Sequence, residues 1–290
     1  MRRLSTLLLV ALLSACAAPP PAPTPAVPAP KPPLKIALVL GGGAARGFAH
    51  IGVIKALEAQ GIMPNMVVGT SAGAVVAALY ASGMSGFDLQ QLALGMQEDM
   101  LADWTMPNRG VLKGEALQDF VNQKVRNLPI QKMAKPLGVV ATDLQNGEMV
   151  LFRRGDTGMA VRASSAVPGV FQPVEINGRD YVDGGLTSPV PAQAARSMGA
   201  DFVIAVDISN VRRRDKLSGT LDVLLQTFAI MGHTISLYQL EDADVVIRPQ
   251  TSAVSSTDFA DRNQAILEGE KAAAAAMQQL KAKLAKAQQR

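Results

Sequence analysis

Apolar runs and helix-like stretches alternate along the chain from residue 34 onward. Short aliphatic runs bounded by turn-forming residues predict buried strands, and longer stretches that end at a glycine predict helices. We expect strands at Leu34–Leu40, Met66–Val68, Leu137–Thr142, Met149–Phe152 and Phe202–Val206, and helices at His50–Gln60, Ala72–Ser82, Thr220–Leu240 and Asn263–Gln288.

This alternation favours an α/β fold of three layers, in which a mostly parallel sheet is covered by helices on both faces. Asn146-Gly147 predicts a hairpin turn before the strand at Met149–Phe152. We expect one domain over residues 34–250 and a helical extension, residues 251–290, that packs on it. Such sheets bind ligands at the carboxyl ends of their strands, so residues that directly follow a strand are the first candidates for chemistry.

The first 33 residues differ in composition from the rest. Two arginines precede an apolar run, Leu7 to Leu13, that is too short to span a bilayer, which predicts an export signal over residues 1–15. Leu13-Ser14-Ala15-Cys16 resembles a bacterial lipobox, in which the signal is cut and Cys16 becomes the lipidated first residue. An ordinary secretory signal is the alternative. Residues 17–33 contain nine prolines and predict an extended, semi-rigid spacer.

A lipidated Cys16 implies a membrane anchor of several acyl chains, because one chain alone binds a bilayer only marginally. Ala17 stands where inner-membrane retention would need an aspartate. The resemblance therefore implies an outer-membrane lipoprotein of the cell envelope, on either face of that membrane.

Composition narrows the chemistry further. The 290 residues are 48% hydrophobic and 18% charged, enough for one sizeable core and unlike a disordered chain. The net charge is +4, but the cations do not cluster with aromatic residues, which disfavours nucleic-acid recognition. One cysteine and two histidines exclude structural disulfides and disfavour a Cys/His metal site. We expect no metal or cofactor, and a reaction that uses hydroxyls, carboxylates and backbone groups.

Gly69-Thr70-Ser71-Ala72-Gly73 lies between an expected strand and an expected helix. In that setting a G-x-S-x-G sequence forms a nucleophile elbow: Gly69 and Gly73 permit the sharp turn, and the Ser71 hydroxyl projects from it. The start of the following helix favours developing negative charge. A glycine-rich packing turn with no chemistry is the alternative.

A second glycine-rich segment, residues 41–47, directly follows the first expected strand. Its backbone N–H groups suit an oxyanion or a phosphate equally well. A phosphate-binding P-loop needs Lys-Ser/Thr after its last glycine, but Phe48-Ala49 stand there. A dinucleotide site needs an acid at the end of the second strand, where Ser71 stands instead. We interpret the segment as an oxyanion hole, formed by Gly41, Gly42, Gly43 and Ala44 with help from the charge of Arg46.

A serine nucleophile needs a base, and neither histidine is well placed. His233 lies inside an apolar expected helix and His50 at the start of the first, where packing or loop support is the simpler role. Asp143, Asp183 and Asp207 each lie at or beyond an expected strand. An ordinary aspartate is a weak base, so an acid in this role has to be buried in a cleft that raises its pKa.

Taken in order, the segments 41–47, 69–73 and Asp183-Gly184-Gly185 resemble the patatin-like phospholipases. The resemblance covers approximately residues 35 to 210 and includes flanking segments such as Phe171-Gln172-Pro173-Val174. It implies a Ser71–Asp183 dyad, with Gly184 and Gly185 supporting the acid, and hydrolysis of phospholipid or lysophospholipid acyl esters. The chain departs from the family at Thr187-Ser188-Pro189, where asparagine often precedes the proline; we expect this to affect loop support.

Two rival functions remain open on the sequence. A membrane-tethered lipid-binding or scaffolding protein would keep the fold without turnover, and a nucleotide-binding module fits the glycine loop less well. Residues Met96 to Met106, with Trp104, are a candidate lid or core filler. Arg212, Arg213 and Arg214 are candidate head-group ligands or a solvated loop. The sequence does not indicate an oligomeric state.

Overall fold

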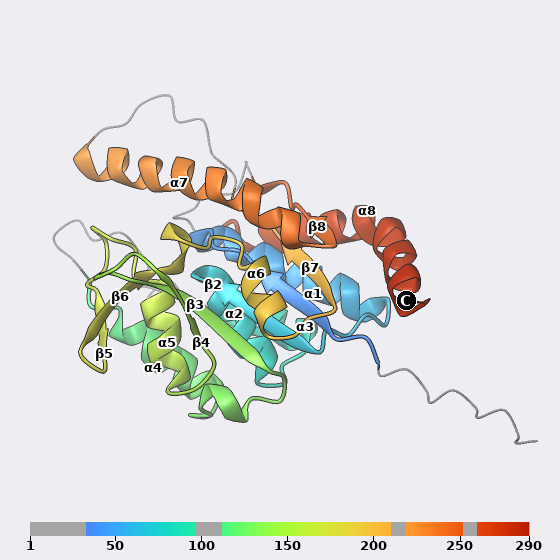
Figure 1. The fold of residues 1–290 in the computed structure, drawn as a ribbon, viewed down its shortest axis with the longest axis horizontal. Helices are drawn as coiled ribbons and strands as arrows, with labels where there is room; N and C mark the ends of the chain where they lie inside the picture. The colour runs from blue at the N-terminus through green and yellow to red at the C-terminus, as the bar shows by residue number, and fades with distance from the viewer. Residues whose placement is uncertain (1–32, 97–111, 210–218, 252–259, 290) are drawn as a thin grey trace, which may run out of the picture. The chain divides into compact units, whose positions relative to one another are not determined.

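One mixed sheet forms the centre of the part that the structure, a computed structural model, describes: residues 33–96, 112–209, 219–251 and 260–289. The described sheet has eight strands, in the order β5-β6-β3-β2-β1-β7-β8, with β4 also paired to β3 (Figure 1). The strands are β1 (Ile36–Leu40), β2 (Met66–Thr70), β3 (Leu137–Asp143), β4 (Met149–Phe152), β5 (Val174–Ile176), β6 (Arg179–Asp183), β7 (Phe202–Val206) and β8 (Val245–Ile247).

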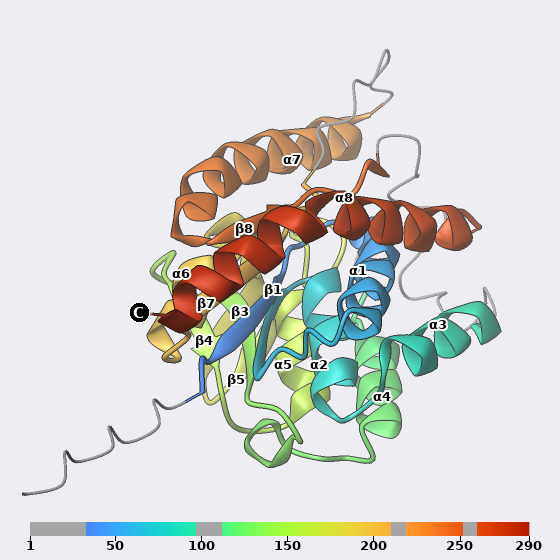
Figure 2. The ribbon, with the colours of Figure 1, turned by 90° about the vertical axis from the view of Figure 1, so that its right-hand side faces the viewer.

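Helices cover both faces of this sheet (Figures 1 and 2). The α-helices are α1 (Phe48–Ala59), α2 (Ala72–Ala81), α3 (Gly86–Gly95), α4 (Glu115–Lys124), α5 (Thr157–Ser164), α6 (Ala192–Ser197), α7 (Thr220–Gln239) and α8 (Arg262–Gln289). Short 3₁₀ turns are η1 (Ala44–Gly47), η3 (Ile130–Lys132), η4 (Gly184–Leu186) and η5 (Leu240–Asp242).

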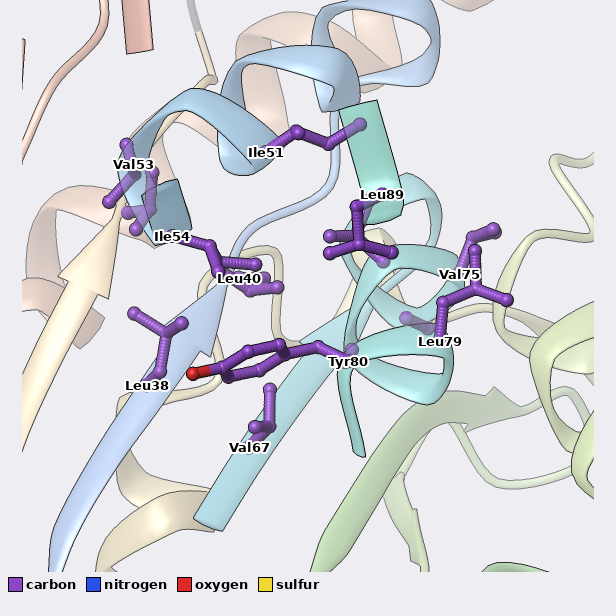
Figure 3. Close-up of a cluster of buried hydrophobic side chains, with 14 of the residues drawn as sticks. Leu38, Leu40, Ile51, Val53, Ile54, Val67, Val75, Leu79, Tyr80 and Leu89 are labelled. Carbon is purple, nitrogen blue, oxygen red and sulfur yellow. The ribbon is translucent and has the colours of Figure 1, made fainter. Parts of the chain in front are cut away.

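Alternation along β1 shows how the layers form. Leu38 and Leu40 point into a large cluster with α1, α2 and α8, and Ala37 and Val39 point into a second cluster with α6 and η5. All four side chains are fully buried, because a strand covered on both faces has no solvent side. Figure 3 shows Leu38 and Leu40 in the first cluster, facing Ile54 of α1 and the ring of Tyr80 of α2. The predicted three-layer α/β fold is confirmed.

The last helix packs closely on the first. A side chain added at Gly269 of α8 would overlap the carbonyl of Ala49, and one added at Gly52 of α1 would overlap the carbonyl of Ile266. These two glycines therefore allow the two backbones to touch. Lys55 of α1 also forms an ion pair with Glu270 of α8. Residues 33–290 form one unit by their contacts, separate from residues 1–32.

Strand β3 brings two distant strands end to end. It pairs with β4 through residues 139–142, with parallel β2 through residues 137–140 and with antiparallel β6 through residues 141–143. A residue of a strand has only two neighbours in the sheet, so β2 and β6 share the side opposite β4. Their carboxyl ends therefore meet, where Val140 pairs with Thr70 and Ala141 with Asp183.

The predicted strands and helices correspond to β1, β2, β3, β4, β7, α1, α2, α7 and α8, with ends within two residues. The hairpin at Asn146-Gly147 is confirmed, since β3 and β4 pair antiparallel across it. The sequence pattern does not predict the other helices and strands, which are α3, α4, α5, α6, β5, β6 and β8. The predictions for Cys16, the proline-rich spacer, Trp104 and the arginines 212–214 concern residues outside the described ones.

Candidate active site

Ser71 stands on a strained turn between β2 and α2. Its backbone has φ 55° and ψ −126°, a conformation that costs roughly 1–3 kcal/mol for a residue with a side chain and persists only where the surroundings enforce it. A Cβ at Gly73 would overlap the Leu40 carbonyl, and one at Gly69 would overlap the Gly73 carbonyl. Close backbone approach therefore requires glycine at both positions of the motif.

The Ser71 hydroxyl donates a hydrogen bond to Asp183. The distance from Ser71 Oγ to Asp183 Oδ2 is 2.7 Å, across 112 positions of sequence. The end-to-end meeting of β2 and β6 on β3 produces this contact, because Ser71 directly follows β2 and Asp183 is the last residue of β6. A side chain at Gly184 would overlap the carbonyl of Val140, so this glycine lets the acid approach β3.

Asp183 is buried and its charge is only partly compensated. The Gly185 N–H donates to Oδ1 at 2.7 Å, and Ser71 donates to Oδ2. Burial raises the pKa of the Asp183 carboxyl from 3.8 to about 6, against the lowering effect of these two hydrogen bonds. The result is an acid that is ionised near neutral pH and still binds a proton readily.

The other two candidate acids have different partners. Asp143 is bound by Arg179, at 2.5 Å between Oδ2 and the guanidinium. Asp207 accepts from the backbone and hydroxyl of Ser209 and forms an ion pair with Arg248 at 3.3 Å. Both therefore have structural roles in the described residues, and of the three expected candidates Asp183 is the one in contact with the elbow serine.

The two histidines support neighbouring loops. His50 is fully buried, and its Nε2 lies 2.8 Å from the carbonyl oxygen of Gly41, so Nε2 carries the proton that it donates. Burial lowers the pKa of His50 to about 4, although the Gly41 bond and the negative charge of Asp207 both act to raise it. His233 Nδ1 lies 2.9 Å from the Ser209 carbonyl oxygen. These contacts agree with the loop-support role predicted for His50.

The glycine loop lies beside Ser71, but not all of its N–H groups are available. Gly41 donates to the carbonyl of Val206 at 3.0 Å, and Gly42 donates to the carbonyl of Pro189 at 2.9 Å. A donor already bonded to a backbone carbonyl does not serve an oxyanion at the same time. The expectation that Gly41 and Gly42 supply oxyanion donors is therefore corrected: they fix the loop in place.

The remaining candidate oxyanion donors are the backbone N–H groups of the next two residues, Gly43 and Ala44. Within the described part of the chain, the backbone N–H groups of Gly43 and Ala44 make no hydrogen bond. Ala44 has a positive φ of 52°, which marks a sharp turn at this point. The Arg46 side chain folds back, and its Nε donates to the Gly43 carbonyl at 3.1 Å. Arg46 therefore stabilises the turn that presents these N–H groups.

Two further side chains hold the elbow, and the sequence reading assigned a role to neither. Ser164, at the end of α5, accepts the Ser71 N–H through Oγ at 2.8 Å and donates to the Val140 carbonyl at 2.5 Å. Thr70 donates to the Ser188 carbonyl at 2.7 Å. A polar residue that ends a largely buried helix is the signal that would have drawn attention to Ser164.

An apolar pocket begins at the same loop. Ala44 and Ala45 of η1 line it together with Ala72, the residue after Ser71, and it continues between α2, α3 and α4 to Leu79, Leu89, Met96 and Phe120. Its lining consists of apolar residues. Among the described residues there is no group of three or more His, Cys, Asp or Glu placed to hold a metal ion.

This geometry agrees with the comparison against protein families. Residues 38–196 match the family model described as patatin-like phospholipase. The match includes the glycine loop, the elbow and Asp183 and covers more than half of the 290 residues. The chain belongs to the patatin-like phospholipase family.

Curated relatives share the same region. This patatin-like chain is 39% identical over 177 residues to an NTE family protein of Mycobacterium tuberculosis, which covers 60% of the chain and 49% of the relative. It is 36% identical over 188 residues to patatin-like phospholipase domain-containing protein 6 of Mus musculus, which covers 62% of the chain and 14% of the relative. The chain thus spans about half the length of its mycobacterial relative.

A solved structure shares the fold. VipD from Legionella pneumophila superimposes with a TM-score of 0.59 at 17% identity, over 86% of this patatin-like chain and 67% of VipD. At this identity the likeness concerns the fold alone.

Proposed function

We propose that this protein is a serine acyl hydrolase that cleaves acyl esters of phospholipids or lysophospholipids through a Ser71–Asp183 dyad. One observation carries the proposal: the elbow serine donates a 2.7 Å hydrogen bond to a buried carboxylate. Membership of the patatin-like family supports the same reaction class. The mouse relative is named for a phospholipase domain, which supports a lipid as the substrate.

In the proposed reaction, Asp183 removes the proton of Ser71 as Oγ attacks the ester carbonyl carbon. A new C–O bond forms, and the carbonyl electron pair moves to the oxygen, which becomes an oxyanion beside the N–H groups of Gly43 and Ala44. Losing one such donor costs about 10²–10³ in rate in comparable sites. The oxyanion then collapses to an acyl-enzyme, and the lipid alcohol leaves with the proton held by Asp183. Water then attacks the acyl-enzyme by the same steps and releases the fatty acid.

Asp183 suits the role of general base because its proton affinity is near the working pH. A carboxyl with a pKa about 6 is mostly ionised at pH 7 and protonated at pH 5. Since only the ionised form accepts the Ser71 proton, kcat/KM falls about tenfold per pH unit below pH 6. A rate that stays level down to pH 4.5 contradicts Asp183 as the base.

The apolar pocket supports a fatty acyl substrate. It begins at Ala44, one of the proposed oxyanion donors, and at Ala72, which follows Ser71, and its walls are side chains of α1, α2, α3 and α4. An acyl chain placed there leaves water and gains about 0.8 kcal/mol per buried CH₂. A larger residue at Val75, Val75→Phe, fills this space and shortens the preferred acyl chain in a p-nitrophenyl ester series, with little effect on the acetate ester.

We also propose that Cys16 is lipidated and anchors the protein in the cell envelope, most simply at the outer membrane. The lipobox-like sequence before Cys16 and Ala17 after it support this location. Cys16→Ala is expected to abolish incorporation of labelled palmitate. Unchanged labelling in this variant removes the anchor from the proposal.

A fluorophosphonate probe separates the hydrolase from a lipid-binding protein without turnover, because it labels only an activated serine. We expect Ser71 to react, Ser71→Ala to lose labelling and ester hydrolysis, and Asp183→Asn to lose most of both. Ser197→Ala is the matched control, since Ser197 on α6 bonds only to the carbonyl of Ala194 in its own helix. Wild-type protein that resists the probe while it binds lipid vesicles supports the scaffolding alternative and overturns the hydrolase.

A further inference from the structure

The outward face of α7 is apolar along its whole length. Six large apolar side chains on this helix are exposed, in three pairs spaced seven residues apart: Val223 and Leu224, Ile230 and Met231, Leu237 and Tyr238. Seven residues are close to two helical turns, so the pairs lie on one stripe. Both views show α7 along the outside of the fold (Figures 1 and 2).

No charged residue interrupts this stripe. The other exposed positions of α7 are the threonines 220, 227 and 234. Thr227 donates its hydroxyl to the Val223 carbonyl at 2.8 Å, and Thr234 donates to the Ile230 carbonyl at 3.1 Å. A hydroxyl bonded to the carbonyl four residues earlier no longer needs water. The face is thus free of charge over about five turns, which is unusual for a helix surface that meets only water.

The inner side of α7 packs on the segment that follows Asp183. Gln239 donates to the Thr187 carbonyl at 3.0 Å and accepts from the Val190 N–H at 3.2 Å. Gly232 lies against the Gly185 carbonyl: a Cβ there would be 3.6 Å from that oxygen. Helix α7 therefore covers the segment that directly follows the acid of the proposed dyad, and its apolar stripe is on the outward side of the helix.

We infer that α7 is an interfacial helix that docks the domain on a lipid bilayer, with its stripe in the boundary between head groups and acyl chains. No helix of the described residues is long and apolar enough to cross a membrane. A helix with one apolar face and one packed face is typical of helices that lie in the plane of a membrane surface. The choice of a bilayer over a protein partner rests on the proposed function, since the adjacent site then takes lipid.

The length of chain before the described domain is compatible with a lipid bilayer as the partner of the α7 stripe. Residues 17–32 lie between Cys16 and the first described residue, and an extended proline-rich chain of that length spans about 3.1 Å per residue, roughly 50 Å in all. If Cys16 is lipidated as proposed above, this length keeps the domain within reach of the bilayer. Docking through α7 would then hold the domain, with the segment that follows Asp183, at the lipid surface.

Two methionines offer a matched pair for a direct test of placement. Met231 on α7 and Met63 before β2 are each 50% exposed, and Cys16 is the only cysteine of the chain. In a Cys16→Ala background, Met231→Cys and Met63→Cys are labelled with an environment-sensitive fluorophore and mixed with phosphatidylethanolamine–phosphatidylglycerol vesicles. We expect a blue shift and quenching by nitroxide lipids at position 231 and neither at 63, with the probe about 5–10 Å deep.

The fluorescence shift does not depend on catalysis. A negative result therefore tests docking through α7 separately from the proposed hydrolase activity. Absence of a shift at 231, or equal shifts at 231 and 63, overturns the inference. So does a shift at 231 that appears without vesicles and grows with protein concentration, because it identifies a second copy of the chain as the occupant.

A second measurement links docking to activity. Ile230→Gln/Leu237→Gln removes two apolar side chains from the stripe, and burial energies for such side chains predict a tenfold or greater loss of vesicle partitioning. Hydrolysis of vesicle phospholipid falls accordingly, and hydrolysis of a monomeric p-nitrophenyl ester stays at the wild-type rate. Equal losses on both substrates contradict docking and indicate damage to the site; unchanged rates on both also contradict it.

Discussion

Asp183→Asn should make the protein more stable at neutral pH while removing its proposed activity. The introduced asparagine would keep the shape of the acid and an acceptor for the Ser71 hydroxyl, but it carries no charge to bury. The folded wild type binds a proton at Asp183 with a pKa about 6, against 3.8 for the ordinary group. A difference of roughly two pH units at about 1.4 kcal/mol each gives about 3 kcal/mol.

The sign of this effect follows from proton binding. Because the folded pKa is raised, the stability that Asp183 contributes is fully present below pH 3.8 and is lost as the pH rises through 6. Wild type and Asp183→Asn should therefore have similar unfolding free energies at pH 4, and the variant should gain up to about 3 kcal/mol by pH 7.5. In a protein of this size that gain corresponds to a rise in Tm of roughly 6–12 °C.

Urea unfolding followed by circular dichroism at several pH values measures the difference between the two proteins. Taking the difference removes every other titrating group, since both chains share them. Parallel curves from pH 4 to pH 8 would refute the reasoning, because they mean that Asp183 has an ordinary pKa in the folded state. A difference that grows toward acid pH would refute it as well.

Three further variants test the structure around the site. The introduced glutamine would be neutral at every pH, so the stability of His50→Gln relative to wild type should improve as the pH falls from 6.5 toward 4. In that range the unfolded wild type binds a proton at His50 that the buried ring does not bind. A constant difference in urea midpoints contradicts the lowered pKa. Gly269→Ala should destabilise the protein by about 1–3 kcal/mol through overlap with α1, whereas Gly95→Ala, with open space around it, should change urea stability by less than about 1 kcal/mol; equal effects reject the close α1–α8 contact. Ser164→Ala leaves the Ser71 N–H without its acceptor and should lower kcat more than it raises KM; an unchanged kcat removes its role in holding the elbow.

The sequence predicts the elbow well because its requirements are local. Gly69 and Gly73 are read as turn glycines from their spacing around Ser71, and the structure shows the backbone approach that demands them. Strands β1 to β4 and β7 contain apolar runs that predict them, and their ends are found within two residues. Strands β5 and β6 carry charged residues among their few apolar ones and give no comparable pattern.

Long-range contacts account for what the sequence does not show. Gly42 appears as a free donor in the sequence, but the carbonyl of Pro189, nearly 150 positions away, already accepts its N–H. Likewise, the two glycines after Asp183 mark this acid in the sequence, but its contact with Ser71 depends on which strand meets β2 across β3. An apolar sequence such as α7 also reads as a buried helix, although one face of it is exposed.

The junction of β2 and β6 makes the reactive pair conditional on a finished sheet. Ser71 follows β2 and Asp183 ends β6, and these two strands do not pair with each other. Strand β3 is the neighbour that both share, so it sets the position of one relative to the other. On the proposed mechanism, a chain in which β6 has not yet joined carries a serine without its base. We propose above that this protein is exported and acts beside a membrane made of its substrate. Hydrolysis would then start only after the sheet of the exported chain is complete.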